Sequence, residues 1–155
     1  ITRPAPKPVD ASPNIAPEAT ASASHCAGLH TENALNDDMG FIWSAWDHRG
    51  TEEWVQLDFE ASRAVAGAEV HWYDDRRWGG ACRPPASWEL LILEGDEWRP
   101  VTGVEMYPTE INGFNNISFE PVTTPALRIL MQLQPEMTAG IYEWRVTPAD
   151  EAPGK

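Results

Sequence analysis

The chain has 155 residues, the usual size of one domain, and it is long enough to bury a core without disulfide or metal staples. Eleven Lys and Arg residues stand against 24 Asp and Glu residues, and the formal net charge of -13 repels nucleic acid and anionic lipid. No apolar run approaches the roughly 20 residues of a membrane span. We therefore expect a soluble domain that binds neither nucleic acid nor membranes.

The two ends of the chain lack the pattern of a folded segment. Residues 1–13 contain four prolines and few large apolar side chains, which is typical of a linker that follows another module. Residues 148–155 are polar and unpatterned, and we expect a flexible tail there. The folded module is therefore expected to span residues 14–147.

Short runs of alternating apolar and polar residues recur along the module. In the first run, Val55, Leu57 and Phe59 alternate with Gln56 and Asp58, which is the period-two pattern of a half-buried strand. The predicted strands cover residues 54–59, 65–73, 88–93, 127–134 and 141–146. The alternation in the third run is apolar on both sides, which indicates a strand buried on both faces.

Glycine, proline and asparagine separate these runs, and no amphipathic helix is evident. Many short strands without a repeat predict an all-β fold, an antiparallel β-sandwich whose sheet edges are covered by long loops. The loops expected to carry function span residues 25–53, 74–86 and 103–115.

Eight tryptophans are a high number for a chain of this length. Burial in strands explains three of them: Trp54, Trp88 and Trp144. Trp43, Trp46 and Trp78 lie instead in segments rich in Gly, Asp, Arg and Ser, where an exposed loop position is expected.

Exposed indoles beside polar side chains are typical of carbohydrate recognition, because a sugar ring stacks its C–H face on an aromatic plane and its hydroxyls need hydrogen-bonding partners. The candidate ligand-binding residues are Trp43, Trp46, His48, Asp75, Arg76, Trp78, Arg83 and Asn115. The alternative is that these aromatics pack under their own loops and that the charges pair with one another.

Clustered oxygen ligands at Asn36, Asp37 and Asp38 are of the hard type that calcium prefers, with Glu143 as a further candidate. The spacing is not that of an EF-hand, and a helix cap or Asx-turn explains the same residues. Cys26 and Cys82 are too few for a disulfide scaffold and lack zinc-site spacing, which leaves one disulfide bridge open.

No catalytic motif is present: the sequence lacks HExxH, GxSxG, a P-loop and a dinucleotide-binding glycine turn. The four histidines do not have the spacing of metal ligands, and the adjacent carboxylates Asp74 and Asp75 are typical of solvated charge. We therefore predict that the chain is not an enzyme.

Four segments together resemble a discoidin, or coagulation-factor type C, domain: residues 14–22, 34–37, 51–59 and 141–146. Residues 70–75, 79–88, 133–135 and 139–144 are similar to accessory modules of bacterial glycoside hydrolases. The resemblance implies an eight-stranded jelly-roll sandwich with a structural Ca²⁺ ion, for which Asn36, Asp37 and Glu143 occupy the ligand positions. The chain departs from the family pattern in carrying Asp38 where glycine is common.

The resemblance also implies a monomeric, secreted, periplasmic or cell-surface module that binds a polysaccharide or glycan for a covalently linked catalytic domain. A second hypothesis is a structural module that packs against a neighbouring domain and binds no free sugar. A third is adhesion to protein or lipid, which the acidity disfavours.

Overall fold

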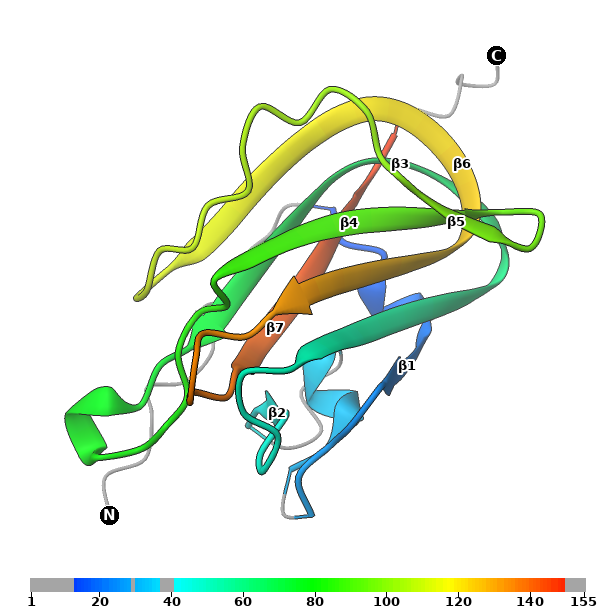
Figure 1. The fold of residues 1–155 in the computed structure, drawn as a ribbon. Helices are drawn as coiled ribbons and strands as arrows, with labels where there is room; N and C mark the ends of the chain where they lie inside the picture. Colours follow the sequence, from blue (N-terminus) through cyan, green and yellow to red (C-terminus); the bar gives the residue numbers. More distant parts are fainter. Residues whose placement is uncertain (1–12, 29, 37–40, 150–155) are drawn as a thin grey trace.

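The computed structural model describes residues 13–28, 30–36 and 41–149, and these residues form an all-β sandwich (Figure 1). Most of the predicted linker at 1–13 and of the predicted tail at 148–155 lies outside the described residues. The strands are β1 (Thr20–Ala23), β2 (Trp43–Ser44), β3 (Glu52–Tyr73), β4 (Ser87–Glu94), β5 (Glu97–Pro100), β6 (Phe114–Gln132) and β7 (Gly140–Pro148). The described helices are short 3-10 turns: η1 (Ala16–Glu18), η2 (Glu32–Leu35) and η3 (Arg76–Trp78). The start of the predicted tail is wrong, because Pro148 is the last residue of β7 and Ala149 N donates to Ala64 O at 2.9 Å.

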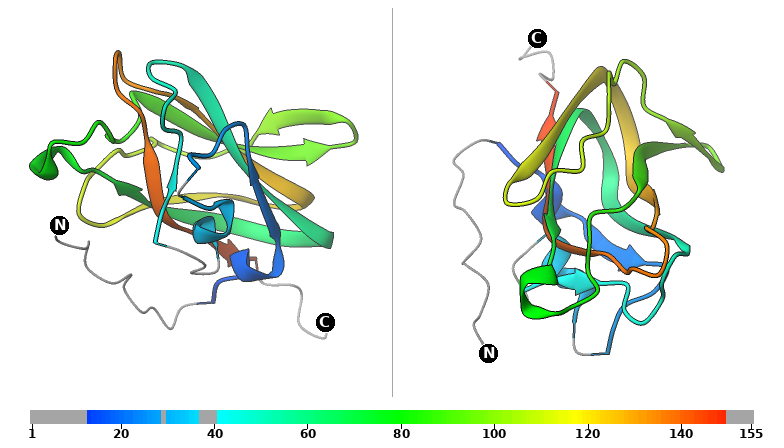
Figure 2. Two further views of the ribbon diagram at one scale, coloured as in Figure 1. Left: turned by 90° about the horizontal axis from the view of Figure 1, so that it is seen from below. Right: turned by 60° about the vertical axis from the view of Figure 1, so that its left-hand side comes forward.

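Strands β3 and β6 run through both layers of the sandwich. The first part of β3 pairs with β1 and with the last part of β6, which in turn pairs with β4. The second part of β3 pairs with the first part of β6 and with β7, and β7 also pairs with β2. All of these pairings are antiparallel, as predicted, and the bend of β3 and β6 joins the layers (Figures 1 and 2).

The core lies between the two layers and takes side chains from both. Alternate residues of the expected runs point inward, and Val55, Leu57, Leu127 and Ile129 are fully buried. Trp88 and Trp144 are buried as predicted, and Trp72 is buried edge to face against Trp88. Trp54 is only half-buried, on the opposite face of β3 from Val55, with the Arg128 guanidinium carbon 4.2 Å from its ring centroid. The hydrophobic stabilisation is therefore concentrated on the strand faces that the period-two pattern predicts.

The predicted strands at 54–59 and 65–73 are parts of one strand. The pairing of β3 with β6 is interrupted between Asp58 and Arg63 and again between Val65 and Gly67. The second interruption lets Val65 and Ala68 both face the core, although an uninterrupted strand would turn them to opposite faces. The alternation of apolar and polar residues predicts the two strand segments but not the bend that connects them.

Strand pairing also determines where the loops meet. Glu52 and Ser87 both pair with Gln132, while Ser44 and Tyr73 both pair with Gly140. The loops between β2 and β3, β3 and β4, and β6 and β7 consequently gather at one end of the sandwich (Figure 1). Among the described residues, no helix has the length and apolar character needed to cross a membrane.

We predict that Ile129→Ala lowers the free energy of unfolding by about 2–5 kcal/mol, because it leaves a cavity between the layers. Leu130→Ala is the matched control, since Leu130 is the next residue of β6 and is only half-buried. The control should lose less than half as much stability in urea denaturation followed by tryptophan fluorescence. Equal losses for the two variants would contradict the assigned inward face of β6.

Candidate functional site

The loop at residues 45–51 is fixed to the connection between β6 and β7 by backbone hydrogen bonds. Ala45 N donates to Ala139 O at 2.9 Å and Gly50 N to Met137 O at 3.0 Å. Gly50 has a φ of 65°, which glycine adopts without steric cost. The loop is thus held at both ends, and its tip is directed to solvent.

Trp46 is at this tip, and its side chain is exposed. Its relative accessibility is 44 %, high for an indole, and the Arg49 guanidinium carbon lies 4.6 Å from the ring centroid. Arg49 Nη1 also donates to Glu136 O at 3.1 Å, which holds the guanidinium beside the ring. The structure therefore confirms the expected exposure of Trp46 and adds an arginine as its neighbour.

The second loop, residues 74–83, is built around Asp75. Its carbonyl oxygen accepts from Trp78 N at 2.9 Å and from Gly80 N at 3.0 Å, while Oδ1 accepts from Cys82 N at 2.8 Å. A Cβ at Gly80 would lie 2.0 Å from the Asp75 carboxylate, so this close turn needs glycine. Asp75 shapes the loop through these contacts.

Trp78 ends η3 and is the other exposed indole on this side of the molecule. It is 42 % accessible, and the Arg77 guanidinium carbon lies 5.3 Å from its ring centroid. Thr138 N donates to Ala81 O and Arg83 N donates to Thr138 O, both at 3.0 Å. The β6–β7 connection therefore contacts both tryptophan-bearing loops and lies between them in Figure 1.

Two predicted ligand-binding residues are structural instead. Trp43 was expected on an exposed loop, but it is fully buried in β2, and its Nε1 donates to His25 O at 3.0 Å. Asn115 is 2 % accessible, donates to Val70 O and Glu110 O, and accepts from Glu110 N. These two predictions are wrong, because pairing between distant strands buries both side chains.

The charged residues of the second loop pair largely with the loop itself. Arg83 Nη1 donates to Gly80 O and Cys82 O, both at 2.9 Å. Arg76 binds Asp74 with an Nη2–Oδ2 distance of 2.6 Å. Burial alone would raise the pKa of Asp74, but the bonds from Arg76 lower it. Of the predicted polar residues on this loop, Arg76 is the most exposed.

His48, the remaining predicted residue, contacts a buried carboxylate that the sequence analysis overlooked. His48 Nδ1 lies 2.7 Å from Glu53 Oε2, and the Glu53 side chain is 4 % accessible. Glu53 shares the strand parity of Val55 and Leu57, which face the core. That parity was the available signal that Glu53 points inward and needs polar partners.

The two cysteines are free thiols in the structure. Cys82 is buried beside Ile42 and Tyr73, and burial together with the negative charge of Asp75 raises its pKa to about 12. Its thiol is therefore protonated and unreactive at neutral pH. No disulfide joins the two residues, which closes the alternative that the sequence left open.

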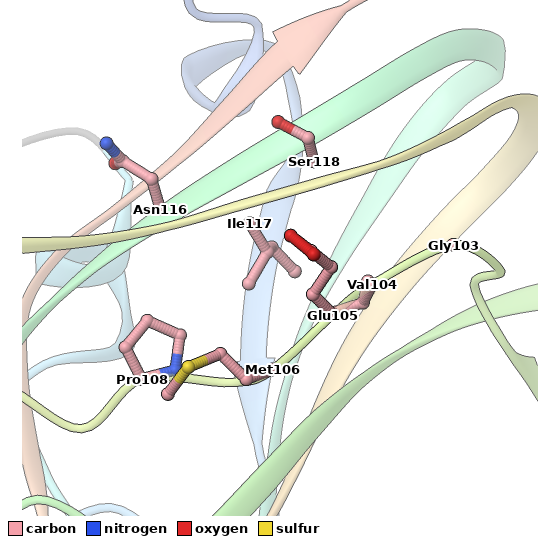
Figure 3. A pocket seen from close by; sticks show the side chains of 8 residues that line it. All are labelled: Gly103, Val104, Glu105, Met106, Pro108, Asn116, Ile117 and Ser118. Atoms are coloured by element: carbon pink, nitrogen blue, oxygen red, sulfur yellow. The ribbon is translucent and has the colours of Figure 1, made fainter.

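A hollow of about 290 Å³ lies on the flank of the sandwich, between the β5–β6 connection and β6 (Figure 3). Met106, Pro108 and Ile117 form its apolar side, and Glu105 and Asn116 provide polar groups. None of its lining residues is aromatic, so it offers no stacking surface for a sugar ring. The exposed loops at the end of the sandwich are therefore the stronger candidate site.

Comparison with known proteins gives a family and a set of similar folds. The model of the F5/8 type C domain matches residues 18–144. A structure from the Streptococcus pneumoniae beta-galactosidase BgaA is 19 % identical, with a TM-score of 0.71, over 84 % of this chain and 92 % of that chain.

Two further similar structures are isolated modules. The family 32 CBM of NanJ from C. perfringens, in complex with galactose, is 18 % identical with a TM-score of 0.68, over 86 % of this chain and 96 % of that chain. Chitosan-binding module 1 from the chitosanase/glucanase of Paenibacillus sp. IK-5 is 20 % identical with a TM-score of 0.65, over 86 % and 97 % respectively. At these identities the likeness shows the fold.

Among the described residues, Asn36 and Glu143 are engaged by other groups at the positions where the resemblance implies calcium ligands. Asn36 is 3 % accessible, and its Nδ2 donates to Ala16 O at 2.8 Å and to Ala19 O at 2.9 Å. Calcium needs six to eight oxygen ligands, whereas here an amide N–H₂ group faces two carbonyl oxygens. Glu143 Oε2 lies 3.9 Å from the Arg145 guanidinium, and Asp37 lies outside the described residues.

We predict that chelator leaves the melting temperature of the native chain unchanged, whereas Asn36→Asp lowers it. The substitution replaces two donated hydrogen bonds with a buried carboxylate that faces two carbonyls, which costs about 3 kcal/mol. For a domain of this size the loss corresponds to a shift of about 10 °C. Thermal denaturation with and without EDTA measures both effects.

Calcium should restore stability to Asn36→Asp and not to the native chain, because only the variant places a negative charge beside the two carbonyl oxygens. Asn33→Asp is the control, since it makes the same change in charge at an exposed position of η2. A fall in the melting temperature of the native chain in chelator would instead show that it holds a structural ion.

Proposed function

Because the chain belongs to the F5/8 type C domain family, whose model matches most of its length, we propose that it is a carbohydrate-binding module without catalytic activity of its own. Its binding surface is formed by Trp46 and Arg49 on one loop and by Trp78, Arg77 and Arg76 on the next. The observation that carries the proposal is the exposure of two indoles, each beside an arginine, on loops that contact the same connection.

The chemistry of the two loops suits a sugar. A large rigid ring at 42–44 % accessibility offers a stacking plane for the C–H face of a pyranose or furanose, with little conformational entropy to lose on binding. Guanidinium groups at the edge supply several N–H donors in a fixed geometry for hydroxyl or ring oxygens. Both halves of sugar recognition are thus present at one end of the sandwich.

The distribution of charge supports the same surface. The chain has only 11 Lys and Arg residues. Four of them, Arg49, Arg76, Arg77 and Arg83, lie on these two loops. In a protein of net charge -13, such a local concentration of donors needs an explanation, and a polar ligand provides one. Arg83 is half-buried and braces its own loop, whereas the other three arginines are exposed and keep N–H groups for a ligand.

Two of the structures with a similar fold are described together with a carbohydrate. One of the similar structures holds galactose, and another is described as chitosan-binding. We infer that the chain is a secreted monomeric module linked to a glycoside hydrolase, and that it raises the effective concentration of that enzyme on its substrate. A weak single site is sufficient for this purpose, because attachment makes the second encounter intramolecular.

A second candidate function is packing against a neighbouring domain. Phe41, Met106 and Ile111 are 42 %, 67 % and 40 % accessible, and such apolar groups suit an interdomain contact. This function predicts that the chain binds no glycan in isolation and that its exposed tryptophans tolerate substitution until the partner domain is present. Binding measurements on the isolated chain therefore separate the two functions.

We predict that Trp46→Ala and Trp78→Ala each weaken glycan binding at least tenfold, a loss of about 1.4 kcal/mol, because each removes a stacking plane. Affinity electrophoresis measures the change, on gels containing galactan, chitosan, alginate, arabinan, pectin or xylan. Both substitutions should leave the melting temperature within about 2 °C, since surface changes cost little stability.

Trp98→Ala is the matched control for this experiment. Trp98 lies in β5 beside Arg128, on a hairpin whose turn is at the opposite end of β4 from Ser87. Its removal should lower the free energy of unfolding slightly and leave the mobility of the protein in glycan-containing gels equal to that of the native chain. Full glycan binding by both Trp46→Ala and Trp78→Ala would show that the sugar site lies elsewhere. Failure of the native chain to bind any of the glycans would favour the packing function.

A further inference from the structure

Three side chains with metal-binding atoms lie together beside the tip of the first loop. The ligand atoms of His25, Asp47 and His48 are all within 4.8 Å of one another. The two imidazole rings are stacked, with 3.6 Å between their centroids and 8° between their planes. The residues come from the segment after β1 and from the β2–β3 loop, so the fold and not local sequence brings them together. Their spacing in the sequence gave no indication of this cluster.

A buried carboxylate lies behind the cluster and fixes one of the rings. Glu53 accepts hydrogen bonds from Ser24 Oγ at 2.5 Å and from Thr51 Oγ1 at 2.6 Å. The two hydroxyl groups donate to this carboxylate, and its Oε2 also lies 2.7 Å from His48 Nδ1. A carboxylate oxygen accepts hydrogen bonds, so in the neutral ring His48 Nδ1 carries the proton and Nε2 keeps its lone pair.

The His25 ring has a weaker support, a single contact with a backbone oxygen. His25 Nε2 lies 3.0 Å from Trp46 O, and a carbonyl oxygen can only accept. Nε2 therefore carries the proton of the neutral ring, and Nδ1 keeps its lone pair. Asp47 Oδ1 lies 3.8 Å from His25 Nε2, and the Asp47 side chain is 76 % accessible. Each of the three residues thus keeps one atom with a free electron pair.

We propose that His25, Asp47 and His48 bind a divalent transition metal of the zinc type, with Glu53 as the residue that positions His48. Two imidazole nitrogens and one carboxylate oxygen form a ligand set that suits Zn²⁺, Ni²⁺ or Cu²⁺, and water completes the coordination. A carboxylate that accepts from the far nitrogen of a ligating histidine is a recurrent outer contact of metal sites, and it raises the basicity of the ligand.

Binding requires a small rearrangement of the two rings. The lone pair of an imidazole lies in the plane of the ring, so two parallel rings cannot both direct a lone pair at one ion. The His25 and His48 side chains are 29 % and 42 % accessible, which leaves room for one ring to tilt out of the stack. Since Glu53 fixes His48, His25 is the ring that moves.

Isothermal titration of Zn²⁺ into the full chain, without an affinity tag, tests the proposal. We expect one ion per chain, with His25→Asn and His48→Asn each weakening binding at least tenfold and Asp47→Asn weakening it less. Glu53→Gln should weaken it about tenfold to a hundredfold, the usual effect of losing such an outer contact. His30→Asn is the control, since it removes an imidazole that packs against Phe41 and lies outside the cluster.

The positioning role of Glu53 has its own readout. Nitrogen-15 NMR of the imidazoles should show His48 protonated at Nδ1 in the native chain and as a mixture of both tautomers in Glu53→Gln. If Glu53→Gln does not fold, the three variants at partly exposed positions still decide the metal site. Absence of saturable Zn²⁺ binding, or unchanged binding by the His25→Asn/His48→Asn double variant, would overturn the proposal, whatever the outcome of the glycan experiments.

Discussion

The pairing of β3 with β6 is the constraint on which the rest of the structure depends. These two strands run side by side through both layers, so their register decides which side chains reach the core in each layer. A slip of β6 by one residue would turn Leu127 and Ile129 to solvent while Val55 and Leu57 of β3 still faced the core. The same register aligns Glu52 with Gln132 and His71 with Phe114, and thereby decides which loops meet at the end that carries the exposed tryptophans.

Local pattern was sufficient to predict the faces of the strands but not the position of every loop residue. Trp43 and Trp46 are three residues apart in similar surroundings, yet one is fully buried and the other is 44 % accessible. The difference comes from pairing of Trp43 with Ile141 nearly 100 residues away, next to Gly140, whose lack of a side chain permits the contact. Sequence periodicity carries no information about such long-range pairing.

For polar residues too, local sequence does not predict which groups a side chain contacts. Residue type predicted oxygen ligands at Asn36 and ligand contacts at Asn115, and in both cases the amide donates to a backbone carbonyl of a distant segment. A buried amide satisfies a carbonyl as a cation would, but without the cost of holding a charge away from water. The sequence shows that a polar group is present, and only the fold shows which groups it must satisfy.

The acidity of the chain and the arginines of the two loops act over different distances. At physiological ionic strength the field of exposed charges decays over about 8 Å, so the net charge of -13 governs the approach of a polyanion and not its final contacts. Within that distance a ligand on Trp46 or Trp78 meets Arg49 and Arg77 first. This combination favours neutral, hydroxyl-rich ligands. The net negative charge of the chain does not repel such ligands, and the arginines of the two loops donate hydrogen bonds to their oxygens.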